Sequence, residues 1–307
     1  MKAVGVIGPD FVPRLFEVDE PTAARNEVVV EVLASSVNEF DRATARGLYN
    51  TQEDRPVLLG RDFVGKVAAV GESVNYIDVG MYVGGALAPQ ASGEMGTFTD
   101  KVAVPAGLLA PVPDGVELAQ VAGVGLAGIT ALDAIGALGI TGLESMMIQG
   151  PVNGVGGFAL QLAKARGALV AALTLPEQAE LAWKLGADVV IPAGTSPKQS
   201  VQRVRGVLGG GVDSAIHVAG DLSITAEIVC PGGKFTSISG AAAVRPLRSE
   251  SEFVQTVIAP NGHKLADLLF KVAARRLRSH VDATLSFDQV ADAVRSRNDS
   301  ERIVLVG

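Results

Sequence analysis

The stretch Met146-Met147-Ile148-Gln149-Gly150-Pro151-Val152-Asn153-Gly154-Val155-Gly156-Gly157 decides the fold of this chain. Its first residues form an apolar run typical of a buried strand, and the run ends in a glycine-rich turn. The turn leads directly into a helical pattern over 158–167 and then into a second apolar run over 168–173. The order strand, turn, helix, strand predicts a dinucleotide-binding unit.

The glycines of this turn let the backbone approach a pyrophosphate closely, and the helix that follows offers unpaired N–H groups at its N-terminus. The turn reads G-P-V-N-G-V-G-G and departs from the plain G-x-G-x-x-G pattern. The alternative is an ordinary tight turn of a parallel α/β sheet. The flanking strands and helix favour a nucleotide cofactor.

The two sides of residue 118 differ in pattern. Before it, short β-branched runs over 28–33, 64–70, 81–85 and 98–104 are separated by glycine, proline and aspartate. After it, apolar strands alternate with helices, which predicts a parallel, doubly wound sheet with a sixth strand over 253–258. Residues 121–140 are apolar enough for a membrane span, but five glycines and Asp133 favour a buried helix pair.

Composition excludes several functional classes. The 307 residues carry a formal net charge of −7 with a pI near 5.1, which argues against nucleic acid or an anionic membrane as partner. Cys230 is the single cysteine, so an intrachain disulfide and a thiolate cluster for zinc are both excluded. The N-terminus turns polar too early for a signal peptide, and we expect a cytoplasmic protein.

Several further segments occur in a characteristic order. They are Ser36-Val37-Asn38-Glu39-Phe40-Asp41 with Arg46-Gly47-Leu48-Tyr49, Pro56-Val57-Leu58-Leu59-Gly60-Arg61-Asp62-Phe63-Val64-Gly65, the turn 150–157, Gly232-Gly233-Lys234 with Ser239-Gly240, and Arg302-Ile303-Val304-Leu305-Val306. Together they resemble the medium-chain dehydrogenase/reductase superfamily, in particular its zinc-independent quinone oxidoreductase branch. The resemblance spans essentially the whole chain.

The resemblance implies an α/β protein of two domains. A GroES-like β-barrel catalytic domain would comprise residues 1–118 and 259–307. A Rossmann domain, a doubly wound parallel sheet that binds NAD(P), would comprise residues 119–258. We also expect a homodimer, because the run 253–258 would be an apolar edge strand if it were left unpaired.

The resemblance also implies that this chain lacks a catalytic metal. In zinc alcohol dehydrogenases a metal-binding cysteine corresponds to Asn38, and the sequence G-H-E corresponds to Gly60-Arg61-Asp62. Tetrahedral zinc prefers thiolate or imidazole ligands, and His217, His263 and His280 all lie outside residues 1–118. We expect His217 to lie within a strand over 214–218 and interpret it as a core histidine with satisfied hydrogen bonds.

Without a Lewis acid, hydride transfer to a quinone or an α,β-unsaturated carbonyl compound (an enone) is the chemistry that stays accessible, because such acceptors delocalise the incoming charge. The expected function is therefore NADPH-dependent, metal-free reduction of a small quinone or enone. A catalytically idle NADPH-binding sensor or structural protein is the alternative, and a small-alcohol dehydrogenase is a third.

The resemblance assigns the site residues. Tyr49 and Asn38 are the predicted catalytic residues, and Asn38 is also predicted to form a hydrogen bond with the nicotinamide ribose or with the acceptor. The branch often has a second tyrosine where this chain has Ala43, which widens the expected pocket. The predicted cofactor-binding residues are Asn38, Thr130, Val152, Asn153, Gly154, Val155, Thr174, Ala219, Gly220, Ile238, Ser239 and Gly240, and no metal ligand is predicted.

The choice between NADPH and NADH depends on the end of the second Rossmann strand. NAD sites usually place Asp or Glu there to bind the ribose 2′-hydroxyl, and such a residue would repel a 2′-phosphate. This chain has Thr174 at that place, and Glu177 follows a proline at the start of a helix. NADPH is therefore expected, as the family implies, and NADH is not excluded because the nearest following cation is Lys184.

Overall fold

The computed structural model describes residues 1–8, 10–48, 55–88, 95–239, 250–296 and 301–307. It divides into two compact units, one of residues 1–129 with 259–307 and one of residues 130–258. The domain change expected at residue 118 coincides with the first residue of helix α2 (Leu118–Leu138), and the division between the units falls within this helix.

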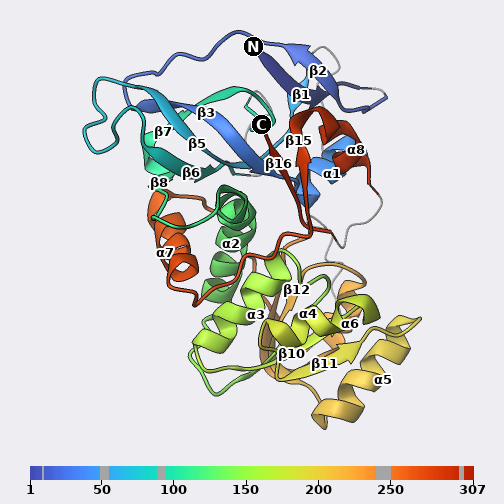
Figure 1. Ribbon diagram of the computed structural model, residues 1–307. Coiled ribbons are helices and arrows are strands. Elements are labelled where there is room, and N and C mark those ends of the chain that lie inside the picture. Colours follow the sequence, from blue (N-terminus) through green and yellow to red (C-terminus); the bar gives the residue numbers. More distant parts are fainter. Residues whose placement is uncertain (9, 49–54, 89–94, 240–249, 297–300) are drawn as a thin grey trace. The chain divides into compact units, whose positions relative to one another are not determined.

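The second unit is an α/β unit with one parallel sheet (Figure 1). Its strands are β9 (Ser145–Gln149), β10 (Leu169–Thr174), β11 (Val189–Pro192), β12 (Val212–His217), β13 (Val229–Ser237) and β14 (Glu252–Phe253). Its helices are α3 (Val155–Ala165), α4 (Ala179–Lys184), α5 (Pro197–Leu208) and α6 (Leu222–Ile228), with a short 3₁₀ helix over Pro176–Gln178.

The strand order β11-β10-β9-β12-β13-β14 shows the doubly wound topology that the sequence predicts. The chain moves outward from β9 to β11 and then returns to β12, on the other side of β9. Right-handed crossovers therefore put α5 and α6 on the opposite face from α3 and α4. The order reverses between β9 and β12, and open α/β sheets bind ligands at such a switch point.

Local sequence signals explain where these helices begin and end. Helix α5 has Ser196 as its N-cap, with the side chain accepting a hydrogen bond from the backbone N–H of Gln199, and Pro197 at its first position. It ends at Gly209, whose φ of +70° favours glycine. The apolar face of α5 packs with α6 on a buried cluster that includes Met147, Ala215 and Phe235 from three neighbouring strands.

The first unit is mainly β-structure, as expected of a GroES-like domain (Figure 1). A seven-stranded sheet contains β15, β16, β3, β5, β6 and β8 in this order, and β7 also pairs with β3; a second sheet has the order β2-β1-β4. The strands are β1 (Lys2–Val6), β2 (Arg14–Glu17), β3 (Glu27–Ser36), β4 (Val57–Leu58), β5 (Asp62–Val70), β6 (Tyr82–Ala86), β7 (Lys101–Pro105), β8 (Leu109–Pro111), β15 (Ala283–Ser286) and β16 (Ile303–Val306).

The C-terminal segment returns to complete this unit. Strand β16 pairs antiparallel with β3, so residues at the end of the chain lie beside residues near 35. The helices of the unit are α1 (Glu39–Ala45), α7 (Gly262–Ala273) and α8 (Val290–Arg295), the 3₁₀ helices Ala106–Leu108 and Phe287–Gln289, and the first part of α2. The predicted final strand over 303–306 is confirmed.

Two expectations from the sequence are wrong in detail. Residues 118–138 form one continuous helix and not a helix pair, because the glycines within it continue the helix and do not break it. By length and composition this helix is able to cross a membrane, but 78% of its apolar stretch is buried inside the protein. The sixth strand covers only Glu252–Phe253 and not 253–258. The homodimer stays a prediction, and the edge strand through which the two sheets would pair is shorter than expected.

Close packing at α2 gives a first testable prediction. A Cβ atom at Gly125 would lie 2.4 Å from the Cβ of Asp62, whereas a Cβ at Gly136 in the same helix meets nothing within 4 Å. Gly125→Ala should lower the free energy of unfolding by about 1–3 kcal/mol through overpacking. Gly136→Ala is the matched control and should raise it by about 0.5–1 kcal/mol through helix propensity. Urea unfolding measures both, and equal effects would contradict the packing argument.

Candidate functional site

The glycine-rich turn brings two chain segments into close approach. Gly150 follows β9 with a φ of +122°, and a Cβ there would lie 2.8 Å from the backbone nitrogen of Ala219. Only glycine accommodates both this conformation and this contact. The turn after β9 and the turn after β12 therefore meet at the carboxyl edge of the sheet, at the switch point between these strands.

Three further glycines of the turn have different environments. A Cβ at Gly156 would lie 2.1 Å from the carbonyl oxygen of Pro151, and one at Gly157 would lie 2.1 Å from that of Val152. A Cβ at Gly154 meets nothing within 4 Å. Gly154 is also the N-cap of α3, and its helix start has no side-chain cap. The open side of the turn thus offers a helix N-terminus to an anionic group, which fits the pyrophosphate of a nicotinamide cofactor.

A glutamine that the sequence analysis did not identify supports this turn. The Gln178 Oε1 atom accepts a 2.8 Å hydrogen bond from the backbone N–H of Val152 and a 3.3 Å hydrogen bond from the Thr174 hydroxyl. Thr174 is 1% exposed, so its hydroxyl points into the protein. Thr174 therefore connects the end of β10 to the turn through Gln178, while its predicted contact with the cofactor stays a prediction.

The parallel sheet brings most of the predicted cofactor residues to one edge. Val152, Asn153, Gly154 and Val155 follow β9, Thr174 ends β10, Ala219 and Gly220 follow β12, and Ile238 and Ser239 follow β13. Thr130 is buried in α2, and Ala43 is buried in α1. Tyr49 and Gly240 lie outside the described residues. Topology alone thus assembles a possible nucleotide site from four strand ends.

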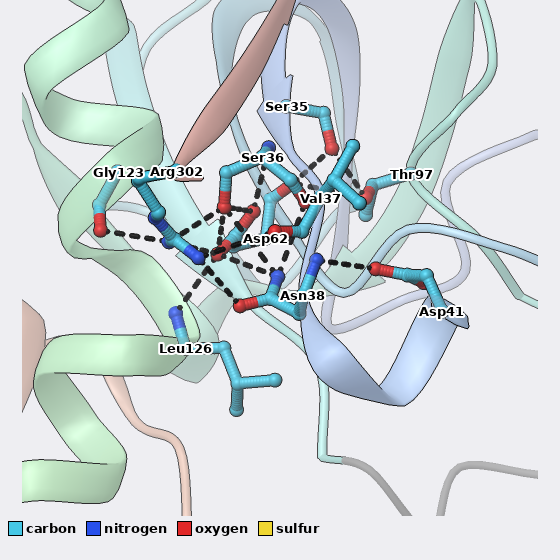
Figure 2. A network of polar contacts seen from close by, with 10 residues as sticks. All are labelled: Ser35, Ser36, Val37, Asn38, Asp41, Asp62, Thr97, Gly123, Leu126 and Arg302. Atoms are coloured by element: carbon cyan, nitrogen blue, oxygen red, sulfur yellow. Dashed lines mark hydrogen bonds and ion pairs between the residues drawn. The ribbon is translucent and has the colours of Figure 1, made fainter. Parts of the chain in front are cut away.

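The first unit contains a buried polar network around Asp62 (Figure 2). Asp62 is fully buried, and its carboxylate accepts hydrogen bonds from the backbone N–H and the hydroxyl of Ser36, at 2.9 and 2.7 Å. It also accepts hydrogen bonds from the Asn38 amide at 3.1 Å and from the backbone N–H of Leu126 at 3.2 Å. The close approach of α2 at Gly125 makes the last contact possible.

The cation of this network is Arg302, which directly precedes β16 (Figure 2). Its guanidinium lies 3.6 Å from the Asp62 carboxylate and donates to the Asn38 Oδ1 at 3.0 Å, the Ser36 hydroxyl at 2.7 Å and the carbonyl of Gly123 at 2.8 Å. Burial lowers the pKa of Arg302, and Asp62 opposes this effect. Arg302 and Asp62 thus form a buried ion pair, and each member is hydrogen-bonded to Ser36 and Asn38.

The Asn38 side chain takes part in this network with both ends of its amide. Its nitrogen donates to Asp62 and to the carbonyl of Ser36, and its oxygen accepts from Arg302. Asn38 is 8% exposed. The structure therefore gives Asn38 a role in the network itself, and its predicted contact with the nicotinamide ribose or the acceptor stays a prediction.

Two further buried charged residues, Asp41 and Arg61, lie near this pair. Asp41 accepts hydrogen bonds from the backbone N–H groups of Asn38 and Gly60, at 2.8 and 2.7 Å. Burial raises the pKa of Asp41 to about 6, against the opposing effect of Arg61. The Arg61 guanidinium lies 4.4 Å from the centre of the Phe40 ring, and burial lowers its pKa. Asp41 thereby links the start of α1 to the Gly60 turn.

The residues at this place do not fit a zinc ion. Arg61 is a cation, and the amide nitrogen and oxygen of Asn38 are both engaged in hydrogen bonds. The carboxylate of Asp62 is paired with a second cation, Arg302. Zinc requires thiolate, imidazole or free carboxylate ligands. Among the described residues, no group of three or more His, Cys, Asp and Glu residues is able to hold a metal ion.

His217 has hydrogen bonds at both ring nitrogens, as expected of a satisfied core histidine, although it ends β12 and does not lie in the middle of the strand. The sequence analysis did not identify three residues as functional. These are Gln149 and Gln178 at the carboxyl edge of the parallel sheet and Arg302 in the network around Asp62. Gln149 and Arg302 each adjoin an apolar strand, and a polar residue at the end of such a strand is the signal that identifies them.

Comparison with known proteins agrees with this geometry. Residues 24–114 match the family model of the alcohol dehydrogenase GroES-like domain, and residues 154–264 match that of the zinc-binding dehydrogenases. An NADPH-dependent alkenal/one oxidoreductase of Arabidopsis thaliana is 27% identical over 89% of this chain and 69% of its own length. An alcohol dehydrogenase of Geobacillus stearothermophilus is 30% identical over 66% of each chain.

Solved structures show the same fold. The quinone oxidoreductase from Coxiella burnetii is 22% identical, has a TM-score of 0.85, and the match covers 100% of this chain and 99% of that chain. At this identity the likeness shows the fold alone. The aligned region spans about two thirds of the length of the two relatives named above.

The open space at Gly154 gives the second prediction. Gly154→Val should weaken binding of a nicotinamide cofactor about ten-fold or more, because the side chain would fill the space above the helix N-terminus that suits a phosphate. Cofactor titration by fluorescence measures the effect. Gly157→Ala is the contrasting variant, since its Cβ would meet Val152 and Leu185, so it should mainly lower the free energy of unfolding. Unchanged affinity in folded Gly154→Val would place the phosphate elsewhere.

The buried ion pair gives the third prediction. Arg302→Met should lower the free energy of unfolding by about 3–5 kcal/mol, because it leaves the charge of Asp62 buried without its partner. The double variant Asp62→Asn/Arg302→Met should be more stable than Arg302→Met, since it leaves no unpaired charge at position 62. Lys184→Met, which breaks the exposed pair with Glu180, is the control and should change stability by less than about 1 kcal/mol. A double variant less stable than the single one would contradict the argument.

Proposed function

Because the chain belongs to the medium-chain dehydrogenase/reductase family, we propose that it is an NADPH-dependent reductase of quinones or α,β-unsaturated carbonyl compounds that uses no metal ion. Family membership makes the protein an oxidoreductase with a nicotinamide cofactor. The observation that carries the finer proposal is the Asn38, Asp62 and Arg302 network, which has the wrong chemistry for zinc.

The argument from this network concerns the charge that develops on the substrate. Oxidation of an alcohol passes through a developing alkoxide, which zinc stabilises as a Lewis acid in metal-dependent enzymes. The guanidinium of Arg302 does not replace zinc in this role, because it is bonded to Asp62, Asn38, Ser36 and the backbone of Gly123. A substrate that delocalises its own charge, such as a quinone or an enone, removes the need for a Lewis acid.

The cofactor-binding residues of the proposal are those at the carboxyl edge of the sheet. The turn at Asn153, Gly154 and Val155 would hold the pyrophosphate, and the strand ends at Gly220 and Ser239 would hold the nicotinamide end. When bound, NADPH supplies a hydride to the β-carbon of an enone or to a quinone. Water supplies the proton that completes the reduction, and Tyr49 stays the predicted donor to the substrate oxygen.

NADPH is proposed over NADH on the chemistry of the second strand. The neutral Thr174 ends β10, and its hydroxyl is bonded to Gln178, so this position bears no carboxylate to repel a 2′-phosphate. The Arabidopsis relative is NADPH-dependent by its name. The proposed partner is a small molecule, with neither nucleic acid nor a membrane as partner, in line with the net charge of −7.

A matched pair of acceptors tests the function, which is the fourth prediction. With NADPH, the protein should reduce the C=C bond of an enone and should leave the saturated ketone of the same carbon skeleton unchanged. With NADP⁺ it should not oxidise the corresponding alcohol, and added zinc or a chelator should change neither result. Product analysis with NADPH deuterated at C4 locates the transferred hydride on the β-carbon.

Three results would contradict the proposal in different ways. Alcohol oxidation that is lost on chelation would establish a metal-dependent dehydrogenase. Tight cofactor binding without turnover of any quinone or enone would establish the alternative, an idle NADPH-binding sensor or structural protein. Equal turnover with NADH would remove the cofactor preference and leave the reaction class intact.

A further inference from the structure

The two polar side chains at the switch point of the sheet are neighbours. Gln149 ends β9 and His217 ends β12, and they are register partners in the parallel pairing of these strands. The residues before each of them are apolar and buried. Both side chains contact the turn over 218–221, which connects β12 to α6.

Gln149 fixes the far end of this turn. Its Nε2 atom donates a 2.9 Å hydrogen bond to the carbonyl of Asp221, and its Oε1 atom accepts a 2.6 Å hydrogen bond from the hydroxyl of Thr225 in α6. The backbone carbonyl of Gln149 also accepts from the N–H of Val218 at 2.8 Å. Gln149 thus holds the start of the turn and its last residue.

His217 fixes the centre of the turn and the neighbouring strand end. Its Nε2 atom lies 3.1 Å from the carbonyl oxygen of Gly220, and its Nδ1 atom lies 2.9 Å from the Ser237 hydroxyl and 3.3 Å from the Ser239 hydroxyl. A carbonyl only accepts, so the proton is on Nε2, and Nδ1 accepts from a serine hydroxyl. Burial lowers the pKa of His217, which keeps the ring neutral, although Asp221 and the bond to Gly220 oppose this effect.

We propose that His217 is a positioning residue of the cofactor site: its neutral imidazole holds Gly220 and Ser239, which follow β12 and β13, in the arrangement that the nicotinamide cofactor binds. The proposal rests on the proposed function, because it takes these two residues as cofactor contacts. The imidazole is 2% exposed, so it acts through Gly220 and Ser239 and not by touching the cofactor.

Gly220 is the point at which this support matters. It is exposed and has a φ of +98°, a conformation that favours glycine. Because glycine has no side chain, its backbone is less restricted than that of other residues. The bond from the His217 Nε2–H is the side-chain contact that restrains its carbonyl. Binding to a mobile turn would have to order that turn, and the cofactor affinity would fall accordingly.

Two substitutions separate the two sides of the imidazole. The amide nitrogen of glutamine reaches about the place of Nε2, so His217→Gln retains a donor for Gly220. The amide oxygen of asparagine reaches about the place of Nδ1, so His217→Asn retains an acceptor for Ser237 and loses the bond to Gly220. Each variant loses one side of the contacts, and both should be destabilised to a similar extent. Ser214→Ala, in the same strand, removes a buried hydroxyl without a hydrogen-bond partner and is the control.

The test is the dissociation constant for NADPH of each full-length variant, with urea unfolding in parallel and the KM for an enone as a further readout. We expect His217→Asn to bind NADPH about ten-fold more weakly, and His217→Gln and Ser214→Ala to stay within about three-fold of the wild type. The KM for the enone should change less than the affinity for NADPH in all three.

The outcomes distinguish this inference from the proposed function. Wild-type affinity in His217→Asn, or equal weakening in His217→Asn and His217→Gln that follows their loss of stability, would reduce His217 to a structural residue. Either result leaves the proposed function intact if the wild type reduces an enone with NADPH. A wild type that binds neither NADPH nor NADH would overturn both.

Discussion

The buried ion pair between Asp62 and Arg302 is the contact on which the first unit depends. Asp62 begins β5 in the N-terminal part of the chain, whereas Arg302 lies only five residues from the C-terminus. Two charges removed from water are stable only when their remaining hydrogen bonds are made. Here Ser36, Asn38, Leu126 and Gly123 provide most of them, and only the Arg302 Nε has no partner among the described residues, so the pair fixes β3, β5, α2 and β16 relative to one another.

The same pair constrains the chemistry of the protein. A buried guanidinium bonded to a carboxylate is a fixed charge that neither exchanges ligands nor leaves a coordination position open. It therefore stabilises the fold where a metal-dependent relative would polarise a substrate. This donor set is the basis on which a quinone or an enone is proposed as substrate in preference to an alcohol, since such acceptors delocalise the charge themselves.

The sequence predicts the second unit better than the polar networks. The alternation of apolar strands and helices after residue 118 predicts the parallel, doubly wound sheet that the structure shows, because each element is encoded locally and crossovers are right-handed. The bond between Arg302 and Asp62 spans 240 residues, and a periodicity analysis has no access to such a pairing. The sequence also does not predict the single helix over Leu118–Leu138, because glycines usually favour a break in a helix. Here three of them allow close packing against Asp62, Ser279 and Leu268, which are distant in sequence.

The proposed cofactor turn would bind an anion through the helix N-terminus of α3. Gly154 leaves the start of α3 open, and Gln178 uses its one oxygen to hold both Val152 and Thr174. Because the Thr174 hydroxyl is bonded internally, this position neither binds a ribose 2′-hydroxyl strongly, as a carboxylate would, nor repels a 2′-phosphate. In the proposed site, the choice between NADPH and NADH would therefore depend on the residues around the 2′-phosphate, because Thr174 bears no carboxylate that would exclude it. In the proposed site, affinity for either cofactor would rest mainly on contacts common to both, namely the helix N-terminus of α3 and the turns held by Gln149 and His217.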